Sequence, residues 1–473
     1  MKVLIFHFRS APGRDWKLSR RVAAHDGIDS AGTDGVSLEI KKRRNLLESM
    51  GHKVTICSAY NWAEFPIPAL EFDSEVARKM MRNLFEHLED FASEAELKRC
   101  FDVSMVDLKQ SLSHAIRDFS PDMLFVHNIF CLPIHPSATV ALAELVREMG
   151  VPCAAIHHDI LSEGAYKFTP TCDFAQSIID RYYPPQMPNI KHWTINSRNE
   201  EALKGKGVAA RVIHDTMDFD DRLDPQSYTR LRSKLRAQHG IEPHDVVLFV
   251  GTRIVPNKQI EIAGHLTATL GDLRQDLIGK RLYHGEIFSE GSRIMLVLAG
   301  RPEVAFRDYQ NKLFKLFNGL GIVWMYVGDK VRPSRSEDQG FYALYPDMYS
   351  MADIVLFPTR WEGFGNQILE AFGAGLPVVV FEYPVFKEDI APKGVDVVSL
   401  GDSVEEDSTG LFHVPDEILA RASRETITIL TTPEKYRGIT KNNITMARLN
   451  FGFDVLRAHL SGAISWAESL KAQ

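Results

Sequence analysis

Two glutamates separated by seven residues give the strongest chemical signal in this sequence. Glu362 lies in a glycine-containing loop after an apolar run that ends at Pro358, and Glu370 lies in the helical pattern that follows. Asn366 is expected to cap that helix. Free N–H groups and the dipole at a helix start attract anions, and carboxylates accept hydrogen bonds from hydroxyl groups. The segment therefore predicts a diphosphate site flanked by groups that bind hydroxyls.

Two cations, Arg253 and Lys258, lie in the loop that follows another apolar run, Val246–Val250. A departing diphosphate needs fixed positive charge, which arginine supplies as a planar fork and lysine as a point charge. Two cations in a loop are often merely solvated. The glutamate pair further along the chain favours the phosphate site over that interpretation.

In the first half, polar residues follow the ends of apolar runs. His157 and His158 follow Cys153–Ile156, and His127 and Asn128 follow Met123–Val126. Each histidine has a second interpretation, as a side chain satisfied in local structure. A metal site is not indicated, because no third ligand occurs at a standard spacing. Gly35 and Asp34 open the first helical pattern, where a glycine lets the backbone approach a ligand closely.

The segments VGTRIVPNKQIE and PTRWEGFGNQILEAFGAGLPVVVF resemble the retaining glycosyltransferases of family four, the group 1 enzymes with the GT-B fold. The resemblance implies that Glu362 contacts the donor sugar and Glu370 the nucleotide ribose, and that Arg253 and Lys258 stabilise the leaving phosphate. His158 matches a family histidine that contacts the donor sugar. Further expected donor contacts are Gly35, Gly363, Phe364, Gly365, Asn366, Gly300 and Val327; expected acceptor-side residues are His157, His127, Asn128 and Asp34.

The resemblance implies transfer of a hexose from a nucleotide diphosphate sugar, of the UDP-glucose or GDP-mannose type, to a hydroxyl of a small acceptor. Retention by a front-face mechanism, without metal or cofactor, is implied with it. Cations between Arg14 and Arg21 suggest an anionic acceptor, or are simply solvated. The segment Phe381–Phe386 replaces a glycine-rich turn of many members, so acceptor specificity is not carried over. The alternatives are a GT-B glycoside phosphorylase that uses inorganic phosphate, and a catalytically silent sugar-nucleotide binder.

The elements that must position these residues are short apolar runs alternating with helical patterns. Nearly continuous apolar runs are typical of parallel strands covered on both faces. The sequence therefore predicts an α/β protein of the GT-B class, with two doubly wound Rossmann-like domains that face a cleft. The expected strands are Val3–Phe6, Val54–Cys57, Met123–Val126, Cys153–Ile156, His192–Ile195, Val246–Val250, Ile294–Ala299, Ile322–Val327, Ile354–Phe357 and Val378–Phe381.

We expect an acceptor domain over residues 1–217, a donor domain over residues 218–452, and a closing helix in 453–473 that crosses back to the first domain. The polar stretch His214–Ser227 is the expected linker, and Asp218 and Asp220 within it are interpreted as linker residues. Trp62–Asp102 is interpreted as a helical insertion. The basic run Lys41–Arg44 is more typical of a solvated helix face than of a membrane contact.

Composition restricts the class of protein. The chain has 473 residues, with 45% hydrophobic and 25% charged side chains, as in folded globular proteins. Its formal charge of −7 argues against a nucleic-acid partner. Five cysteines without a CxxC pair are typical of reduced thiols, and we find neither a secretory signal nor a membrane-spanning run. The expectation is a soluble cytoplasmic enzyme.

Overall fold

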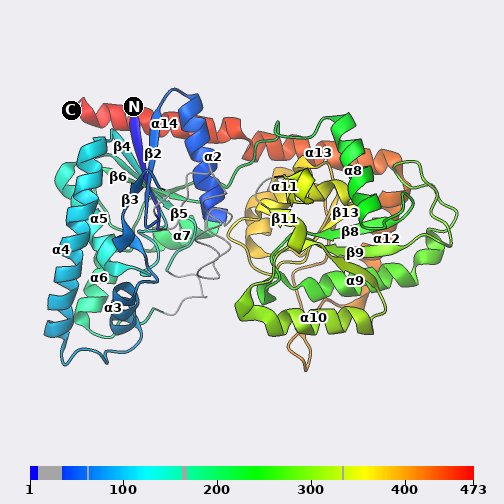
Figure 1. Cartoon of the computed structure of the whole chain (residues 1–473), viewed down its shortest axis with the longest axis horizontal. Helices are drawn as coiled ribbons and strands as arrows, with labels where there is room; N and C mark the ends of the chain where they lie inside the picture. Colours follow the sequence, from blue (N-terminus) through cyan, green and yellow to red (C-terminus); the bar gives the residue numbers. More distant parts are fainter. Residues whose placement is uncertain (9–34, 61–62, 162–167, 333–334, 473) are drawn as a thin grey trace. The chain divides into compact units, whose positions relative to one another are not determined.

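The structure is a computed structural model that describes residues 1–8, 35–60, 63–161, 168–332 and 335–472. The chain forms two compact units (Figure 1). Unit one contains Met1–Asp215 and Asp454–Gln473, and unit two contains Thr216–Phe453. The GT-B fold class predicted from the sequence is confirmed, because each unit is built on a parallel sheet connected by helices.

Unit one has a seven-stranded parallel sheet in the order β3-β2-β1-β4-β5-β6-β7. The chain order reverses between β1 and β4, and in such sheets ligands bind outside the carboxyl ends of the strands at this switch point. Its elements are β1 (Lys2–Phe6), α2 (Gly35–Ser49), β2 (Lys53–Ser58), β3 (Phe65–Pro66), η1 (Pro68–Leu70), α3 (Glu75–Phe85), α4 (Glu94–Phe119), β4 (Met123–His127), α5 (Pro136–Met149), β5 (Cys153–His157), α6 (Asp173–Tyr182), β6 (Ile190–Thr194), α7 (Ser197–Gly205), β7 (Ala210–Val212) and α14 (Phe453–Lys471).

Unit two has a six-stranded parallel sheet in the order β10-β9-β8-β13-β14-β15, with its switch point between β8 and β13. Its elements are α8 (Pro225–Gln238), β8 (Val246–Val250), η2 (Pro256–Lys258), α9 (Ile260–Asp272), η3 (Arg274–Asp276), β9 (Ile294–Leu298), η4 (Val304–Phe306), α10 (Arg307–Gly319), β10 (Val323–Tyr326), η5 (Gly328–Lys330), β11 (Val331–Arg332), η6 (Glu337–Gln339), β12 (Tyr342–Ala343), η7 (Met348–Met351), β13 (Ile354–Phe357), α11 (Asn366–Gly373), β14 (Val378–Val380), η8 (Phe386–Ile390), η9 (Ala391–Lys393), β15 (Val398–Ser399), β16 (Glu405–Glu406), β17 (Phe412–His413), α12 (Asp416–Thr431) and α13 (Pro433–Phe451).

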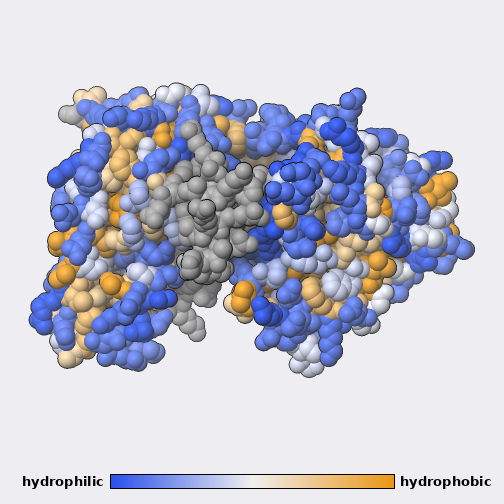
Figure 2. Space-filling model, viewed as in Figure 1, coloured by the Kyte–Doolittle hydropathy of each residue, from blue (hydrophilic) through white to orange (hydrophobic). Residues whose placement is uncertain are grey.

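The central strands are apolar because helices cover both of their faces. Every residue of β4, β5, β8 and β13 is buried. These strands match the predicted apolar runs to within a residue or two at their ends. The short strands β3, β7 and β15 at the sheet edges were not predicted, because two or three residues carry no periodicity. The visible surface is largely hydrophilic (Figure 2), and no helix of the described residues is long and apolar enough to span a bilayer.

The closing helix α14 packs on unit one, as the sequence predicts. Lys471 pairs with Asp122, Arg457 Nη1 donates to Ser49 Oγ at 3.2 Å, and the Lys191 ammonium lies 4.5 Å from the Trp466 ring centroid. One sequence interpretation is wrong in this unit. Arg43 and Arg44 of the basic run Lys41–Arg44 are buried on α2 rather than solvated.

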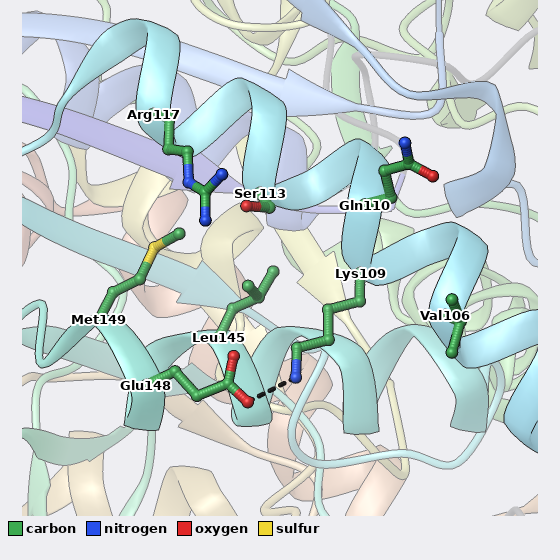
Figure 3. Close-up of a pocket in the computed structure, with 8 residues that line it drawn as sticks. All are labelled: Val106, Lys109, Gln110, Ser113, Arg117, Leu145, Glu148 and Met149. Atoms are coloured by element: carbon green, nitrogen blue, oxygen red, sulfur yellow. Dashed lines mark hydrogen bonds and ion pairs between the residues drawn. The ribbon is translucent and has the colours of Figure 1, made fainter.

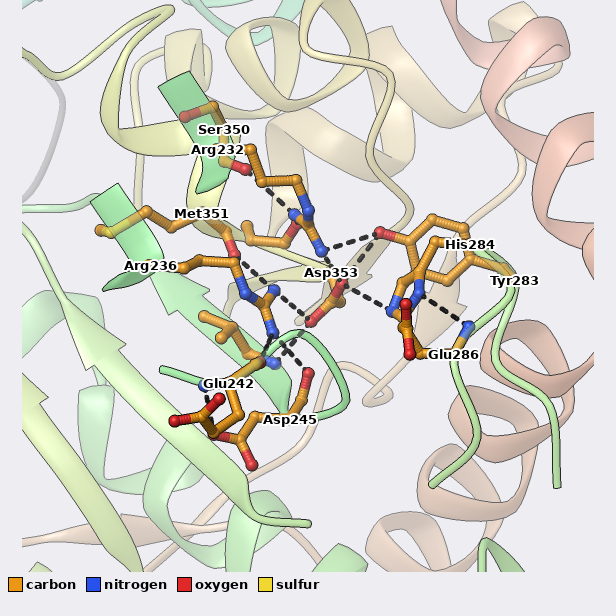
Figure 4. A network of polar contacts seen from close by, with 12 residues as sticks. Arg232, Arg236, Glu242, Asp245, Tyr283, His284, Glu286, Ser350, Met351 and Asp353 are labelled. Carbon is orange, nitrogen blue, oxygen red and sulfur yellow. Dashed lines mark hydrogen bonds and ion pairs between the residues drawn. The ribbon is translucent and has the colours of Figure 1, made fainter. Parts of the chain in front are cut away.

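A buried carboxylate, Asp353, connects the elements at the amino edge of the second sheet (Figure 4). Its Oδ2 accepts the Val247 N–H at 2.7 Å, which joins the start of β13 to β8. Arg232 Nη2 and Arg236 Nη1, both on α8, donate to its two oxygens at 2.5 and 3.2 Å. Burial opposes ionisation, but the two guanidinium groups prevail and lower the pKa of Asp353 to about 2.

We predict that Asp353→Asn lowers the free energy of unfolding of unit two by about 3–5 kcal/mol, because two buried guanidinium groups lose their counter-charge. The folded pKa lies below the unfolded value near 3.9, so the ionised carboxylate stabilises the fold above about pH 4 and loses that effect as the pH falls toward 2. Urea unfolding at pH 7 and at pH 3 tests both points. Asp220→Asn is the control, because Asp220 is 81% exposed in its pair with Arg448; equal midpoints for the two variants would contradict the prediction.

Candidate functional site

The loops after β8 and β13 meet at the switch point of unit two. Lys258, whose side chain is 4% exposed, forms an ion pair with Glu362. The same two loops are joined by Asn257, whose carbonyl accepts the Arg360 N–H at 3.0 Å and whose Nδ2 donates to the Trp361 carbonyl at 3.2 Å. Two residues predicted from separate motifs are thereby in direct contact. Within the described part of the chain, the half-buried Glu362 carboxylate therefore neutralises the buried Lys258 ammonium.

Arg253 is placed differently from its predicted partner Lys258. Its guanidinium is 65% exposed and pairs with Glu303, on the loop after β9. Among the described residues the structure thus brings Lys258, but not Arg253, to Glu362. An exposed ion pair contributes little to stability, so the pair with Glu303 does not hold Arg253 in place.

Gly365 gives the Glu362 loop its shape. Its φ is +126°, a conformation that L residues rarely adopt, and an added Cβ would lie 2.2 Å from Tyr383 Oη. The Tyr383 hydroxyl donates to the carbonyl of Phe364, whose ring packs edge-on against Phe451 at 5.3 Å. Tyr383 lies in the segment that departs from the family's glycine-rich turn, and sequence reasoning gave it no role. The structure shows that this tyrosine holds the predicted binding loop through a hydrogen bond to its backbone.

Helix α11 begins at Asn366, so the prediction that Asn366 caps the helix is wrong. The cap residue is Gly365, which has no side chain to accept from the helix. A helix start whose N–H groups have no side-chain cap is suited to an anion. Gly363 lies half-exposed in the loop just before it.

Glu370 lies one turn into α11, and Tyr349 orients its carboxylate. The Tyr349 hydroxyl donates to Glu370 Oε2 at 2.8 Å, and its ring packs against Phe249 of β8 at 5.0 Å. Burial, and then the Glu370 charge, raise the pKa of the tyrosine well above its ordinary value, so it stays a donor. Tyr349 lies outside the motif, so the sequence did not identify it as the partner of Glu370.

The two predicted backbone contacts near β9 and β10 have defined positions. A Cβ on Gly300 would lie 1.5 Å from the Thr252 carbonyl oxygen, so only glycine allows the loops after β8 and β9 to approach this closely. The Val327 N–H donates to the Leu298 carbonyl at 2.8 Å, and its own carbonyl accepts from Lys330 at 3.0 Å. The Val327 amide is committed to the fold, which leaves only its carbonyl able to accept a further bond.

In unit one, four predicted residues lie at the carboxyl ends of β4 and β5, and three of them, His127, Asn128 and His158, contact one another. His127 Nδ1 lies 3.1 Å from His158 Nε2, and the two rings stack at 5.4 Å. Asn128, in the left-handed region at φ +57°, accepts the His158 N–H at 2.8 Å and donates to Asp159 Oδ2 at 3.1 Å. Asn128 therefore positions His158 and Asp159 with both ends of its amide.

His157 points the other way, to a partner within the sheet. Its Nε2 lies 3.0 Å from His192 Nδ1, on the neighbouring strand β6. Burial lowers the pKa of His127, His157 and His158 well below the ordinary value, and it raises the pKa of Asp159. The lowered pKa values favour neutral imidazoles, which exchange hydrogen bonds with polar groups, and His158 Nδ1 also lies 4.0 Å from Oδ1 of Asp215.

Gly35 is the exposed first residue of α2, and nothing lies within 4 Å of an added Cβ there. The fold itself does not require glycine at this position. Asp34 and the cations Arg14–Arg21 lie outside the described residues.

A surface pocket of about 330 Å³ lies between α4 and α5 (Figure 3). Its lining includes the ion pair of Lys109 with Glu148, at 2.5 Å, and none of the predicted site residues. No group of three or more histidine, cysteine, aspartate or glutamate side chains in the described part of the chain is placed to hold a metal ion.

Comparison with known proteins identifies one matching family and two relatives that share a name. The family described as "Glycosyl transferases group 1" matches residues 332–409. Mannosylglucosylglycerate synthase of Thermotoga maritima is 31% identical over 90% of this chain and 96% of its own length. The protein of the same name from Petrotoga mobilis is 30% identical over 90% of this chain and 97% of its own.

Solved structures share the fold at low sequence identity. HepE of Anabaena, solved with UDP and glucose, has a TM-score of 0.55 at 16% identity, over 98% of this chain and 99% of its own. Sucrose-phosphate synthase of Thermosynechococcus elongatus has a TM-score of 0.60 at 14% identity, over the full length of both chains.

We predict that Gly365→Ala lowers the free energy of unfolding by about 1–3 kcal/mol, because the new side chain is strained at this φ and meets the Tyr383 hydroxyl. Gly35→Ala, where the added methyl meets nothing, is the matched control and should stay within about 0.5 kcal/mol of the parent. In a Tyr383→Phe background the Gly365→Ala loss should be smaller, because the colliding oxygen is gone. Chemical denaturation of all four variants measures this coupling, and strict additivity would refute the clash.

Proposed function

The chain belongs to the group 1 glycosyltransferases, and on that premise we propose that it transfers a mannosyl unit from a nucleotide diphosphate sugar to a hydroxyl of glucosylglycerate. The observation that carries the proposal is the similarity to mannosylglucosylglycerate synthase over 96% of that relative's length. The product named there contains a sugar acid, in accord with the anionic acceptor expected from the sequence. Of the two donors considered, GDP-mannose is favoured.

The reaction we propose retains the anomeric configuration. The bond between the anomeric carbon and the phosphate oxygen breaks, and the acceptor oxygen forms a bond to the same face of that carbon. The acceptor's proton passes to the departing phosphate oxygen, and the nucleoside diphosphate leaves. This front-face path needs no protein nucleophile, and it needs donors aimed at the charge that grows on the phosphate.

The contact of Lys258 with Glu362 supports a shared role for the two side chains. Binding of the donor brings phosphate oxygens to the Lys258 ammonium, which releases the Glu362 carboxylate to accept from a sugar hydroxyl. Within the described part of the chain Arg253 is held by an exposed ion pair with Glu303, so it can turn to the same phosphates. These two cations and the start of α11 would supply the positive charge that a metal ion supplies in other transferases, so we propose a metal-independent reaction.

Glu370 supports the nucleotide end of the site. The Tyr349 hydroxyl donates to one oxygen of its carboxylate, and we propose that this oriented carboxylate accepts from the ribose hydroxyls. His158, neutral and positioned by Asn128, is proposed to contact the donor sugar.

Lys258→Ala is expected to lower kcat by about 100-fold or more, because a preorganised charge at the leaving group is lost. Steady-state kinetics with GDP-mannose and glucosylglycerate measures this. Lys435→Ala, at an exposed position of α13, is the control for loss of a lysine and should keep the parental kcat. An unchanged kcat in Lys258→Ala would remove the leaving-group role.

Nucleotide binding separates the transferase from the phosphorylase. We expect GDP to raise the melting temperature in parallel trials with UDP, ADP and inorganic phosphate, since a ligand at 100 times its Kd stabilises a fold by about 2.7 kcal/mol. Glu370→Ala should weaken the GDP effect, and Tyr349→Phe should weaken it less. Stabilisation by phosphate alone would favour the phosphorylase and would refute the ribose role of Glu370.

A further inference from the structure

Helix α9 starts two residues after Lys258, and buried polar groups fix its first turn. Glu261, in that turn, is fully buried. Its Oε1 accepts the Phe412 N–H at 3.0 Å, and its Oε2 accepts the Tyr309 hydroxyl at 2.5 Å. The same hydroxyl accepts the N–H of Ile260, the first residue of the helix, at 3.0 Å. The backbone that leads out of Lys258 is therefore held by Tyr309 of α10 and by Phe412 of β17.

The ring of Phe412 contacts the loop that carries Glu362. The Arg360 guanidinium lies 5.3 Å from the centroid of that ring, within the range of a cation–π contact. Arg360 precedes Glu362 by two residues. Because Phe412 is half-buried and Arg360 is exposed, the ring is the better fixed of the two groups. One residue thus contacts the helix after Lys258 with its backbone and the loop before Glu362 with its side chain.

The hairpin β16–β17 that carries Phe412 has its own anchors. Asp407 Oδ1 accepts the N–H groups of Thr409 and Leu411 at 2.7 and 3.1 Å, which fixes the turn between the two strands. Lys312 Nζ, on α10, donates to the Thr409 carbonyl at 2.7 Å. The side chain of Leu411, next to Phe412, is buried. The position of Phe412 is therefore set by contacts that involve neither loop of the candidate site.

We propose that Phe412 is a positioning residue that aligns Lys258 with Glu362. Its effect on transfer rests on the proposed function, whereas the alignment does not. The two charged groups come from separate loops, and a displacement of about 1 Å near reacting groups can cost about 100-fold in rate. Asn257 joins these loops directly, and Phe412 supports both from a third element. Loss of the ring would release the Glu362 side while the N–H bond still holds the start of α9.

Steady-state kinetics with GDP-mannose and glucosylglycerate tests the effect on transfer. Phe412→Leu keeps the backbone N–H and an apolar side chain but removes the ring, and it should lower kcat about 10-fold. Phe412→Tyr keeps the ring and should restore most of that loss. Phe341→Leu is the matched control, because Phe341 is also half-buried with an arginine over its ring, Arg332 at 4.1 Å. This variant should keep the parental kcat.

Double variants distinguish alignment from a general effect on the fold. In a Lys258→Ala background, Phe412→Leu should lower kcat by less than about 2-fold, because no pair remains to be aligned. Arg360→Met removes the other half of the cation–π contact, so it should lower kcat as Phe412→Leu does. The two changes together should cost no more than about 10-fold. A merely structural role would instead multiply the separate losses.

Chemical denaturation measures the coupling without turnover. The loss of stability caused by Phe412→Leu should be smaller in the Lys258→Ala background than in the parent protein. Additive losses of stability, a parental kcat in Phe412→Leu, or multiplied losses of kcat in the double variants would each overturn the inference. A parent protein that shows this coupling but neither binds GDP nor transfers mannose would refute the proposed function and retain the alignment.

Discussion

The ionised Asp353 is the constraint on which the second unit depends. One buried carboxylate accepts from β8 and from two arginines of α8, and its backbone carbonyl accepts the Tyr436 hydroxyl of α13 at 3.1 Å. These bonds fix β8 against β13 at the amino edge of the sheet. Because both strands are short and parallel, fixing their starts also fixes their ends, where Lys258 and Glu362 meet. The positions of Lys258 and Glu362 at one edge of the sheet thus depend on a buried charge at the other.

The two units solve the same problem in different ways. Unit two neutralises its buried Lys258 with a carboxylate of its own, whereas the described part of unit one leaves Arg43 with two unmet donors.

Much of the fold followed from the sequence, because apolar strand runs and glycine-punctuated helices are local patterns. The contact of Lys258 with Glu362 was also accessible, since both residues follow strands that a doubly wound sheet brings together. The roles of Tyr349 and Tyr383 could not be predicted, because a buried tyrosine looks the same in sequence whether it fills a core or hydrogen-bonds to a loop. Arg43 was misjudged for the same kind of reason: four consecutive basic residues on a helix must face different directions, and a composition-based interpretation treats them alike.

The ion pair of Lys258 with Glu362 has a consequence for which molecules can occupy the site. While Lys258 and Glu362 are paired, a ligand that binds the ammonium must first separate it from the carboxylate. The free energy lost in that separation offsets the free energy gained from the ammonium. A molecule that offers a phosphate alone would leave the Glu362 carboxylate without its cation. One that offers hydroxyls alone would leave the Lys258 ammonium without its anion. A molecule with both groups at the right separation would satisfy each partner, so the closed pair would favour a phosphate joined to a sugar over either group alone.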